Sequence, residues 1–343
     1  MRGKDGDFMA KDRRANAVVF GFDFQVNAAI VLMLENIEDL KSLRLEGNYE
    51  DIELELANNQ YILAQAKAVE RASSDFNNVR ANLQKSLTSL SEGEKKVDAQ
   101  KLILITNSPN PLKEKVSTNL FTGDARRDFS SLPDSSQQII KKYIDDVNKP
   151  LDLSKFMIQV LPFETDNELE RYKIVRRCID DFIGDLNLSI PGLGKRLMNL
   201  WQNEVFINGT KKDADIKLKK ADIVWPIMVI ATDVERCDDS LFDLFDLSTY
   251  DEIVHQYKST IDSHCERCEF FTKVLSDYNS FICTERPSEK PLAFAKEKWK
   301  SYLTEFQIDN IDAETLQGLI QIILYTIVRN RITIDRIKRG VKL

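Results

Sequence analysis

An alternating segment at residues 51–56 constrains the fold of this chain more than any other feature. Apolar residues take every second position there, and acidic residues fill the positions between them. Because successive side chains of a strand point to opposite faces, the pattern predicts a strand with one apolar face. Residues 61–68 predict a second strand, and a polar link of four residues joins the two. So short a link predicts an antiparallel hairpin.

The rest of the first half alternates between helical and strand-like patterns. Helices are predicted at 23–35 and 76–90, and further strands at 43–46, 101–106 and 156–163. The continuous apolar run at 101–106 is typical of a strand buried on both faces. This order predicts an α/β domain over residues 1–165, with a mixed sheet flanked by helices.

After residue 165 the strand signals fade, and residues 166–343 are predicted to form a mostly α-helical domain. Helices are predicted at 167–186, 192–203, 212–234, 241–264, 269–280, 293–306 and 312–331. The apolar segments 223–231 and 319–328 exceed what one thin helical layer would bury. We therefore expect them to face another chain and to make the protein a homo-oligomer or dock it on a partner.

Charge and composition restrict the classes of function. The chain has 48 basic and 55 acidic residues and a formal net charge of −7, which excludes nucleic-acid binding by bulk charge alone. It has two histidines, so a histidine-rich metal site is unsupported. Five cysteines in a long chain, a polar segment at residues 1–14 and no evident membrane-spanning run predict a cytoplasmic protein without membrane association.

Three residues of the predicted hairpin combine in a pattern that suits phosphodiester hydrolysis. Gln65 and Lys67 share one face of their strand, and antiparallel pairing brings Asp51 to the same end of the sheet. A carboxylate is a hard ligand for Mg²⁺, and a lysine can stabilise charge that develops on a phosphorane. The alternative is that these charged residues, with Glu53 and Glu55, form a solvated strand face.

The order of these motifs resembles the PD-(D/E)xK restriction-endonuclease superfamily. More narrowly, it resembles the double-stranded DNA endonuclease domain of CD-NTase-associated nucleases from bacterial anti-phage systems. The resemblance covers roughly residues 14–165 and lies in three motifs, which are Gly21-Phe-Asp-Phe-Gln25, Glu50-Asp51-Ile-Glu53 and Ala64-Gln65-Ala66-Lys67.

The resemblance implies the roles of individual residues. Asp51 would be the metal-ligating aspartate, Gln65 a second ligand and Lys67 the catalytic lysine, with Glu50, Glu46 and Gln25 as further contributors. Gln65 and Gln25 are amides where many relatives carry acids. The cofactor would be Mg²⁺, with Mn²⁺ as a substitute.

The resemblance also implies an activity and its control. The chain would be a metal-dependent endonuclease that cuts double-stranded DNA as an effector of anti-phage defence. It has no phosphate-binding loop of its own, so control would come from oligomerisation or from a HerA-type hexameric ATPase partner. The competing hypothesis is a catalytically inactive helical assembly or adaptor protein of such a complex.

Two further features leave alternatives open. Cys265 and Cys268, with His264 and His255 nearby, indicate either a zinc site or ordinary helix packing. The C-terminal basic run would contact DNA phosphates or an acidic partner, or else end a solvated helix; it comprises Arg329, Arg331, Arg336, Lys338, Arg339 and Lys342.

Overall fold

The computed structural model describes residues 16–69, 76–163, 166–231, 247–308 and 310–343. The chain forms two compact units. The first consists of residues 1–178 and 201–218, and the second of residues 179–200 and 219–343. The boundary expected at residue 165 differs from this division, because residues 166–178 and 201–218 pack with the α/β unit. The polar N-terminal segment at residues 1–14, on which the prediction of a cytoplasmic protein partly rested, lies outside the described residues.

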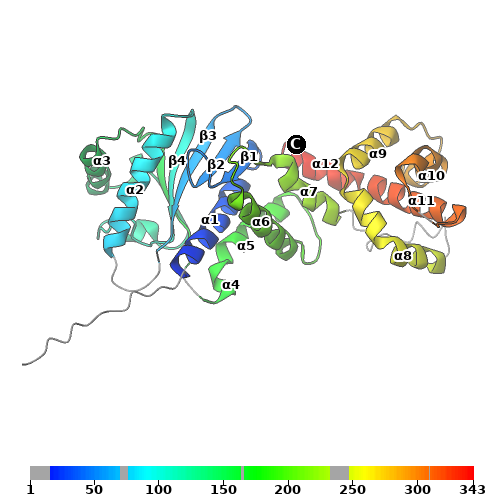
Figure 1. Cartoon of the computed structure of the whole chain (residues 1–343), viewed down its shortest axis with the longest axis horizontal. Coiled ribbons are helices and arrows are strands. Elements are labelled where there is room, and N and C mark those ends of the chain that lie inside the picture. Colours follow the sequence, from blue (N-terminus) through cyan, green and yellow to red (C-terminus); the bar gives the residue numbers. More distant parts are fainter. Residues whose placement is uncertain (1–15, 70–75, 164–165, 232–246, 309) are drawn as a thin grey trace, which may run out of the picture. The chain divides into compact units, whose positions relative to one another are not determined.

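The first unit contains a mixed seven-stranded sheet, as the sequence predicted for this half of the chain (Figure 1). The strand order is β5-β6-β4-β3-β2-β1-β7. Strands β3, β4 and β6 are parallel to one another, and the pairs β1/β2, β2/β3 and β5/β6 are antiparallel. The strands are β1 (Leu40–Leu45), β2 (Ile52–Leu56), β3 (Tyr61–Lys67), β4 (Ala99–Thr106), β5 (Ala125–Asp128), β6 (Phe156–Val160) and β7 (Leu218–Lys219).

The predicted hairpin is confirmed. Ile52 pairs with Ala64 and Glu55 with Tyr61, so β2 and β3 run antiparallel. Asp51 directly precedes β2, and Gln65 and Lys67 lie at the end of β3. The register therefore brings these three residues to one end of the sheet.

Helices cover both faces of this sheet (Figure 1). The helix α1 (Asn16–Glu35) packs against β1, β2 and β3, whereas α2 (Phe76–Glu94) packs against β3 and β4 and against α3 (Asp134–Val147). Leucine and isoleucine side chains from α2, α3, β4 and β6 form one continuous hydrophobic cluster. This core fixes the strand ends that carry the candidate site.

Several elements of the first unit were not predicted. The edge strand β5 and the helix α3 lie between the predicted strands at 101–106 and 156–163, where the sequence analysis predicted no element. The strand β5 has only four residues and is partly exposed, so it shows no clear apolar pattern. Part of the predicted helix at 212–234 instead forms a loop and the strand β7, and the helix begins at Lys220. The short strand β7 has too few residues to show any periodicity.

The helix α1 is more apolar than the sequence analysis recognised. By length and composition, residues Ala17–Glu35 would suffice to cross a membrane, contrary to our expectation that the chain has no such segment. Its polar residues interrupt the apolar run in the sequence, which is why the segment was missed. Core helices of soluble proteins have the same composition, and Phe24 and the residues from Ala28 to Met33 are at most 1% exposed. We therefore interpret α1 as the central helix of the α/β unit.

The acidic face of β2 is not a solvated face, which corrects the alternative interpretation of Glu53 and Glu55 as part of a solvated strand face. Glu53 is 3% exposed, and its register partner Arg44 is 1% exposed. The Arg44 guanidinium donates to the backbone carbonyls of Asn208, Lys211 and Ile216, at 2.5, 2.8 and 3.1 Å. A segment 164 to 172 residues further along the chain thus covers this face, which local periodicity cannot reveal.

Glu55 is expected to stabilise the protein in a pH-dependent way. Burial would raise the pKa of Glu55, but hydrogen bonds from Lys217 and Lys41 outweigh this effect and lower the pKa to about 2. The stabilisation is therefore present above the unfolded-state pKa of 4.5 and is lost as the pH falls toward 2. We expect Glu55→Gln to lose about 1 to 2 kcal/mol at pH 7, a range reduced because Lys41 is half exposed.

Urea unfolding of the wild type and of Glu55→Gln, at pH 7 and again near pH 2, measures this effect. The difference between the two proteins should shrink toward zero at the acid end. A difference that is equal at both pH values would contradict the assignment, because it would then reflect packing and not charge.

The second unit is helical, as predicted for this half of the chain. The short helix α4 (Glu168–Arg171) precedes it in the first unit, and α5 (Lys173–Asp185) and α6 (Leu193–Thr210) each contribute residues to both units. The remaining helices are α7 (Lys220–Ala231), α8 (Leu247–Glu266), α9 (Cys268–Ser280), α10 (Lys290–Lys298), the 3-10 helix η5 (Trp299–Glu305), α11 (Ala313–Arg329) and α12 (Arg331–Gly340).

The apolar segments of this unit do not supply an exposed face for another chain. All residues from Gly318 to Val328 in α11 are buried, and α11 packs against α8, α9, α10 and η5. In α7, most apolar residues are also buried, including Ile223, Val224, Ile227 and Met228. Our interpretation of these segments as oligomer contacts was wrong, because the helices of the same unit surround them on several sides.

Candidate active site

The structure brings Asp51, Gln65 and Lys67 together at the end of β3. One carboxylate oxygen of Asp51, Oδ2, accepts hydrogen bonds from the Gln65 side-chain amide and from the backbone N–H of Ala66 at 3.1 Å. The Lys67 ammonium lies 3.4 Å from the same oxygen. The side chains of Asp51 and Lys67 are 19% and 26% exposed, so a substrate can reach them.

The neighbouring strand fixes this end of β3. Lys67 pairs with Thr106 in the parallel ladder, and the Thr106 hydroxyl donates to the Lys67 carbonyl at 2.6 Å. The buried Asn107 side chain accepts from the Val69 N–H at 2.7 Å and donates to the Val69 carbonyl at 2.8 Å. These two positioning residues were missed, because the sequence shows them only as the end of an apolar strand.

A buried carboxylate shapes the turn that precedes Asp51. Glu53 accepts hydrogen bonds from the backbone N–H groups of Tyr49 and Glu50. A Cβ at Gly47 would overlap this carboxyl group, so a larger residue there would have to displace Glu53. Glu46 has a left-handed backbone with a φ of 53°, and its N–H bonds the Asp51 carbonyl at 2.7 Å. The turn thereby holds Glu46, Glu50 and Asp51 in fixed positions.

Glu46 and Gln25 lie next to this group, as the sequence analysis proposed. Partial burial of its carboxyl group raises the pKa of Glu46, and the nearby Asp51 raises it further. A hydrogen bond from the Gln25 side chain and the charge of Lys67 oppose this rise. The helix α1 therefore contributes Gln25 to the same site as the hairpin.

Glu50 is the most strongly perturbed carboxyl group of the site. It is 5% exposed, and burial raises its pKa to about 8, assisted by the Asp51 charge. Neither carboxyl oxygen has a hydrogen bond of good geometry, although the Ser89 hydroxyl lies near enough to oppose the rise in pKa. A buried carboxyl without a well-formed hydrogen bond lowers the stability of the fold. Such groups are common at sites that bind a ligand.

These donors fit a magnesium ion better than a metal that requires many protein ligands. Among the described residues there is no group of three or more His, Cys, Asp or Glu side chains arranged to hold a metal. Asp51, Gln65 and the unpartnered oxygens of Glu50 are oxygen donors, and Mg²⁺ takes one or two carboxylates and retains several waters. As a ligand, Gln65 would present its amide oxygen to the ion, which requires a rotation of the amide group.

The contacts of His264 do not support a zinc site near Cys265. The two ring nitrogens of His264 face the backbone carbonyls of Thr260 and Glu305, at 2.8 and 3.2 Å. The ring also stacks on Phe306 with a centroid distance of 4.1 Å. The Cys265 side chain is buried. These contacts favour helix packing, the second alternative left open by the sequence.

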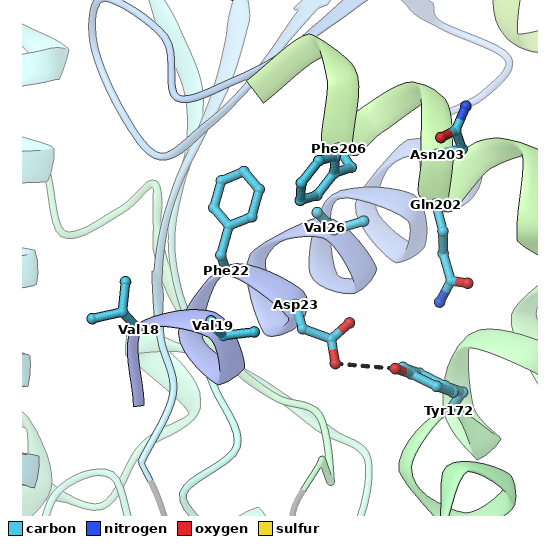
Figure 2. Close-up of a pocket in the computed structure, with 9 residues that line it drawn as sticks. All are labelled: Val18, Val19, Phe22, Asp23, Val26, Tyr172, Gln202, Asn203 and Phe206. Atoms are coloured by element: carbon cyan, nitrogen blue, oxygen red, sulfur yellow. Dashed lines mark hydrogen bonds between the residues drawn. The ribbon is translucent and has the colours of Figure 1, made fainter. Parts of the chain in front are cut away.

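Helix α1 also borders a pocket of about 510 Å³ in the α/β unit (Figure 2). Val18, Val19, Phe22, Val26 and Phe206 make its walls mostly apolar. The polar groups of this region bond one another. The Tyr172 hydroxyl donates to Asp23 at 3.0 Å, Asn27 donates to Asp23 at 2.9 Å, and Gln202 donates to Asn27 at 2.8 Å. Burial raises the pKa of Asp23, and the bond from Tyr172 and the charge of Arg171 oppose this. These groups are already partnered, so we assign no chemistry to the pocket.

Comparison of the chain with protein-family models, curated proteins and solved structures found no match. The candidate site is therefore argued from the arrangement of its own residues.

Proposed function

We propose that this chain is a metal-dependent endonuclease that hydrolyses phosphodiester bonds of double-stranded DNA, with a restriction-endonuclease-like α/β unit. The observation that carries the proposal is the meeting of Asp51, Gln65 and Lys67 at one carboxylate oxygen. A carboxylate, an amide and an ammonium on adjacent strand ends match the needs of phosphodiester hydrolysis, which are a metal ligand and a positive charge at the transition state.

Each residue of the site has a separate proposed role. Asp51 and Gln65 would hold Mg²⁺, and Glu50 lies close enough to Asp51 for the Asp51 charge to help raise the pKa of Glu50. When bound, the ion supplies a Lewis acid that polarises the phosphoryl group and acidifies a water. Lys67 places a positive charge beside the carboxylate, where it can stabilise the negative charge that develops on the phosphorane. Glu53 and Thr106 keep the turn and the strand end in position.

Plasmid cleavage by the purified chain tests the proposal directly. Supercoiled plasmid should be nicked or linearised in Mg²⁺ or Mn²⁺ and remain intact in EDTA. A chain that does not cut, alone or with a candidate ATPase partner, would support the alternative of an inactive assembly or adaptor protein.

By the same resemblance, we propose that cleavage serves anti-phage defence and is controlled by oligomerisation or by a HerA-type ATPase. Light scattering of the full chain over a concentration series, with and without the partner, measures assembly. A monomer at every concentration that is fully active without a partner would contradict this control.

Lys67→Ala is expected to lower the cleavage rate by at least about 100-fold, because one preorganised charge at the transition state has an effect of this size. Duplex binding in EDTA should change less than about threefold, since one ammonium adds little to a contact with many phosphates. Initial cleavage rates and fluorescence anisotropy measure the two quantities. Lys41→Ala is the matched control, because Lys41 is also a strand lysine paired with a carboxylate, Glu55, but lies outside the site. A parallel loss of binding and cleavage would show that Lys67 binds a substrate phosphate, and would contradict its assignment to the transition state.

A further inference from the structure

Three cationic side chains of the helical unit gather over two buried aromatic rings. The Lys290 ammonium lies 4.8 Å from the ring centroid of Tyr278 and 6.0 Å from that of Phe281. Lys298 lies 5.6 Å from the Phe281 centroid, and the Arg331 guanidinium 5.2 Å from the Tyr278 centroid. Lys290 thus shares one ring with each of the other two cations. We call these three cations, with their two rings, the basic patch.

Helix geometry creates the patch from separate parts of the sequence. Tyr278 and Phe281 lie at the end of α9, Lys290 and Lys298 are the two ends of α10, and Arg331 begins α12. The two rings flank the buried Phe294 of α10, at centroid distances of 5.4 and 5.5 Å. This aromatic packing fixes the rings, and the cations therefore converge on a rigid base.

The charge of the patch is largely uncompensated. Within the described residues, neither Lys290 nor Lys298 has a carboxylate partner within ion-pair distance. Arg331 has a long contact of 3.9 Å to Asp335 and donates to Asn279 at 3.4 Å. By contrast, Lys273 of the same unit also lies over a ring, that of Tyr302, but is paired with Glu305 at 3.1 Å. Clustered like charges without counter-charges attract an anion.

We propose that the basic patch binds the phosphate backbone of duplex DNA and gives the helical unit a DNA contact of its own. The choice of duplex DNA rests on the proposed function, whereas the affinity for a polyanion follows from the patch. Tyr278 and Phe281 are 5% and 8% exposed, so bases cannot stack on them. The contact is therefore made to phosphates, without sequence selectivity and with strong dependence on salt.

Other polyanions fit the patch less well. A membrane-binding surface needs a broad exposed apolar face beside its cations. Among the described residues next to the patch in sequence, the large exposed apolar side chains are those of Ile282 and Ile332, at 93% and 64%, and they are single residues from two separate segments. The repeating phosphates of a nucleic acid can engage several cations at once, which is what the convergence of Lys290, Lys298 and Arg331 provides.

The test measures the salt dependence of duplex binding by the full chain in EDTA, where no cleavage occurs. Fluorescence anisotropy with a duplex of roughly 20 base pairs gives the slope of log K against log salt, to which each phosphate contact adds about −0.9. In the triple variant Lys290→Gln, Lys298→Gln, Arg331→Gln, this slope should become less steep by about 2 to 3, and affinity at low salt should fall at least about tenfold.

Two controls separate charge from structure. Lys273→Gln removes a lysine that lies over a ring but is already neutralised, and it should leave the slope unchanged. The charge-conserving variant Lys290→Arg, Lys298→Arg, Arg331→Lys should keep the wild-type slope. Equal slopes in the wild type and the triple glutamine variant would overturn the proposal. It would also be overturned if the triple glutamine variant lost binding to phosphatidylserine vesicles while its duplex binding stayed unchanged.

The outcomes also distinguish the patch from the nuclease proposal. A wild-type chain that binds duplex with the predicted slope but never cuts in Mg²⁺ would refute the nuclease function and leave the patch standing. A chain that cuts normally, with a patch variant of unchanged slope, would refute the patch alone.

Discussion

Asp51→Asn is expected to abolish DNA cleavage, with a loss of at least about 100-fold, while leaving the fold intact. Asparagine has nearly the same shape as aspartate but no negative charge. In this site a single carboxylate oxygen of Asp51, Oδ2, contacts Gln65, Ala66 and Lys67. The uncharged amide of Gln65 cannot supply the negative charge that the substitution removes. Initial rates of plasmid nicking over a Mg²⁺ series, with thermal unfolding as the test of folding, measure the effect.

Asp98→Asn is the matched control for this variant. Asp98 also accepts a hydrogen bond from a glutamine side chain, Gln60, at 3.0 Å, but it lies by the opposite ends of β3 and β4. Its replacement should leave cleavage unchanged. An Asp51→Asn protein that cuts at the wild-type rate and Mg²⁺ concentration would show that the metal is held elsewhere.

Arg44→Met should cause the largest loss of stability, about 3 kcal/mol or more, because it deprives three carbonyls of a charged donor in a buried setting. Methionine preserves much of the length of the side chain, so the loss would reflect the hydrogen bonds to Asn208, Lys211 and Ile216. Urea unfolding measures the change, and proteolysis should become faster between residues 208 and 217.

Arg127→Met provides the comparison for this variant. Arg127 is also a strand arginine, but its bond is to the carbonyl of the adjacent Arg126. A loss below about 0.5 kcal/mol is expected there, as for most surface substitutions. An equally small loss for Arg44→Met would show that the segment is held by its apolar contacts.

The hairpin and its register were predictable from sequence, because strict alternation and a short link allow few arrangements. Those two facts were enough to bring Asp51 near Gln65 and Lys67. They could not show that Glu53 is buried, since the cover comes from residues 208–217 through Arg44. They also could not show the roles of Thr106 and Asn107, which depend on the parallel pairing of β3 with β4.

The helical half shows the limit of periodicity more plainly. The apolar runs of α7 and α11 predicted helices correctly but not what covers them, which is other helices of the same unit. The basic patch was visible in the sequence only through Arg331, a member of the C-terminal basic run. Its other members come from α9 and α10, and no local pattern unites them with Arg331.

The discontinuous first unit has a consequence for synthesis on the ribosome. Residues 201–218 belong to the α/β unit, and Arg44 finds its partners among them. The sheet therefore cannot be completed when residue 165 has been made, and must wait for a further stretch of chain that takes roughly 3 to 10 s to translate. During that interval Arg44 and the free edge of β1 remain uncovered, so this edge is open to pairing with another strand until β7 has emerged.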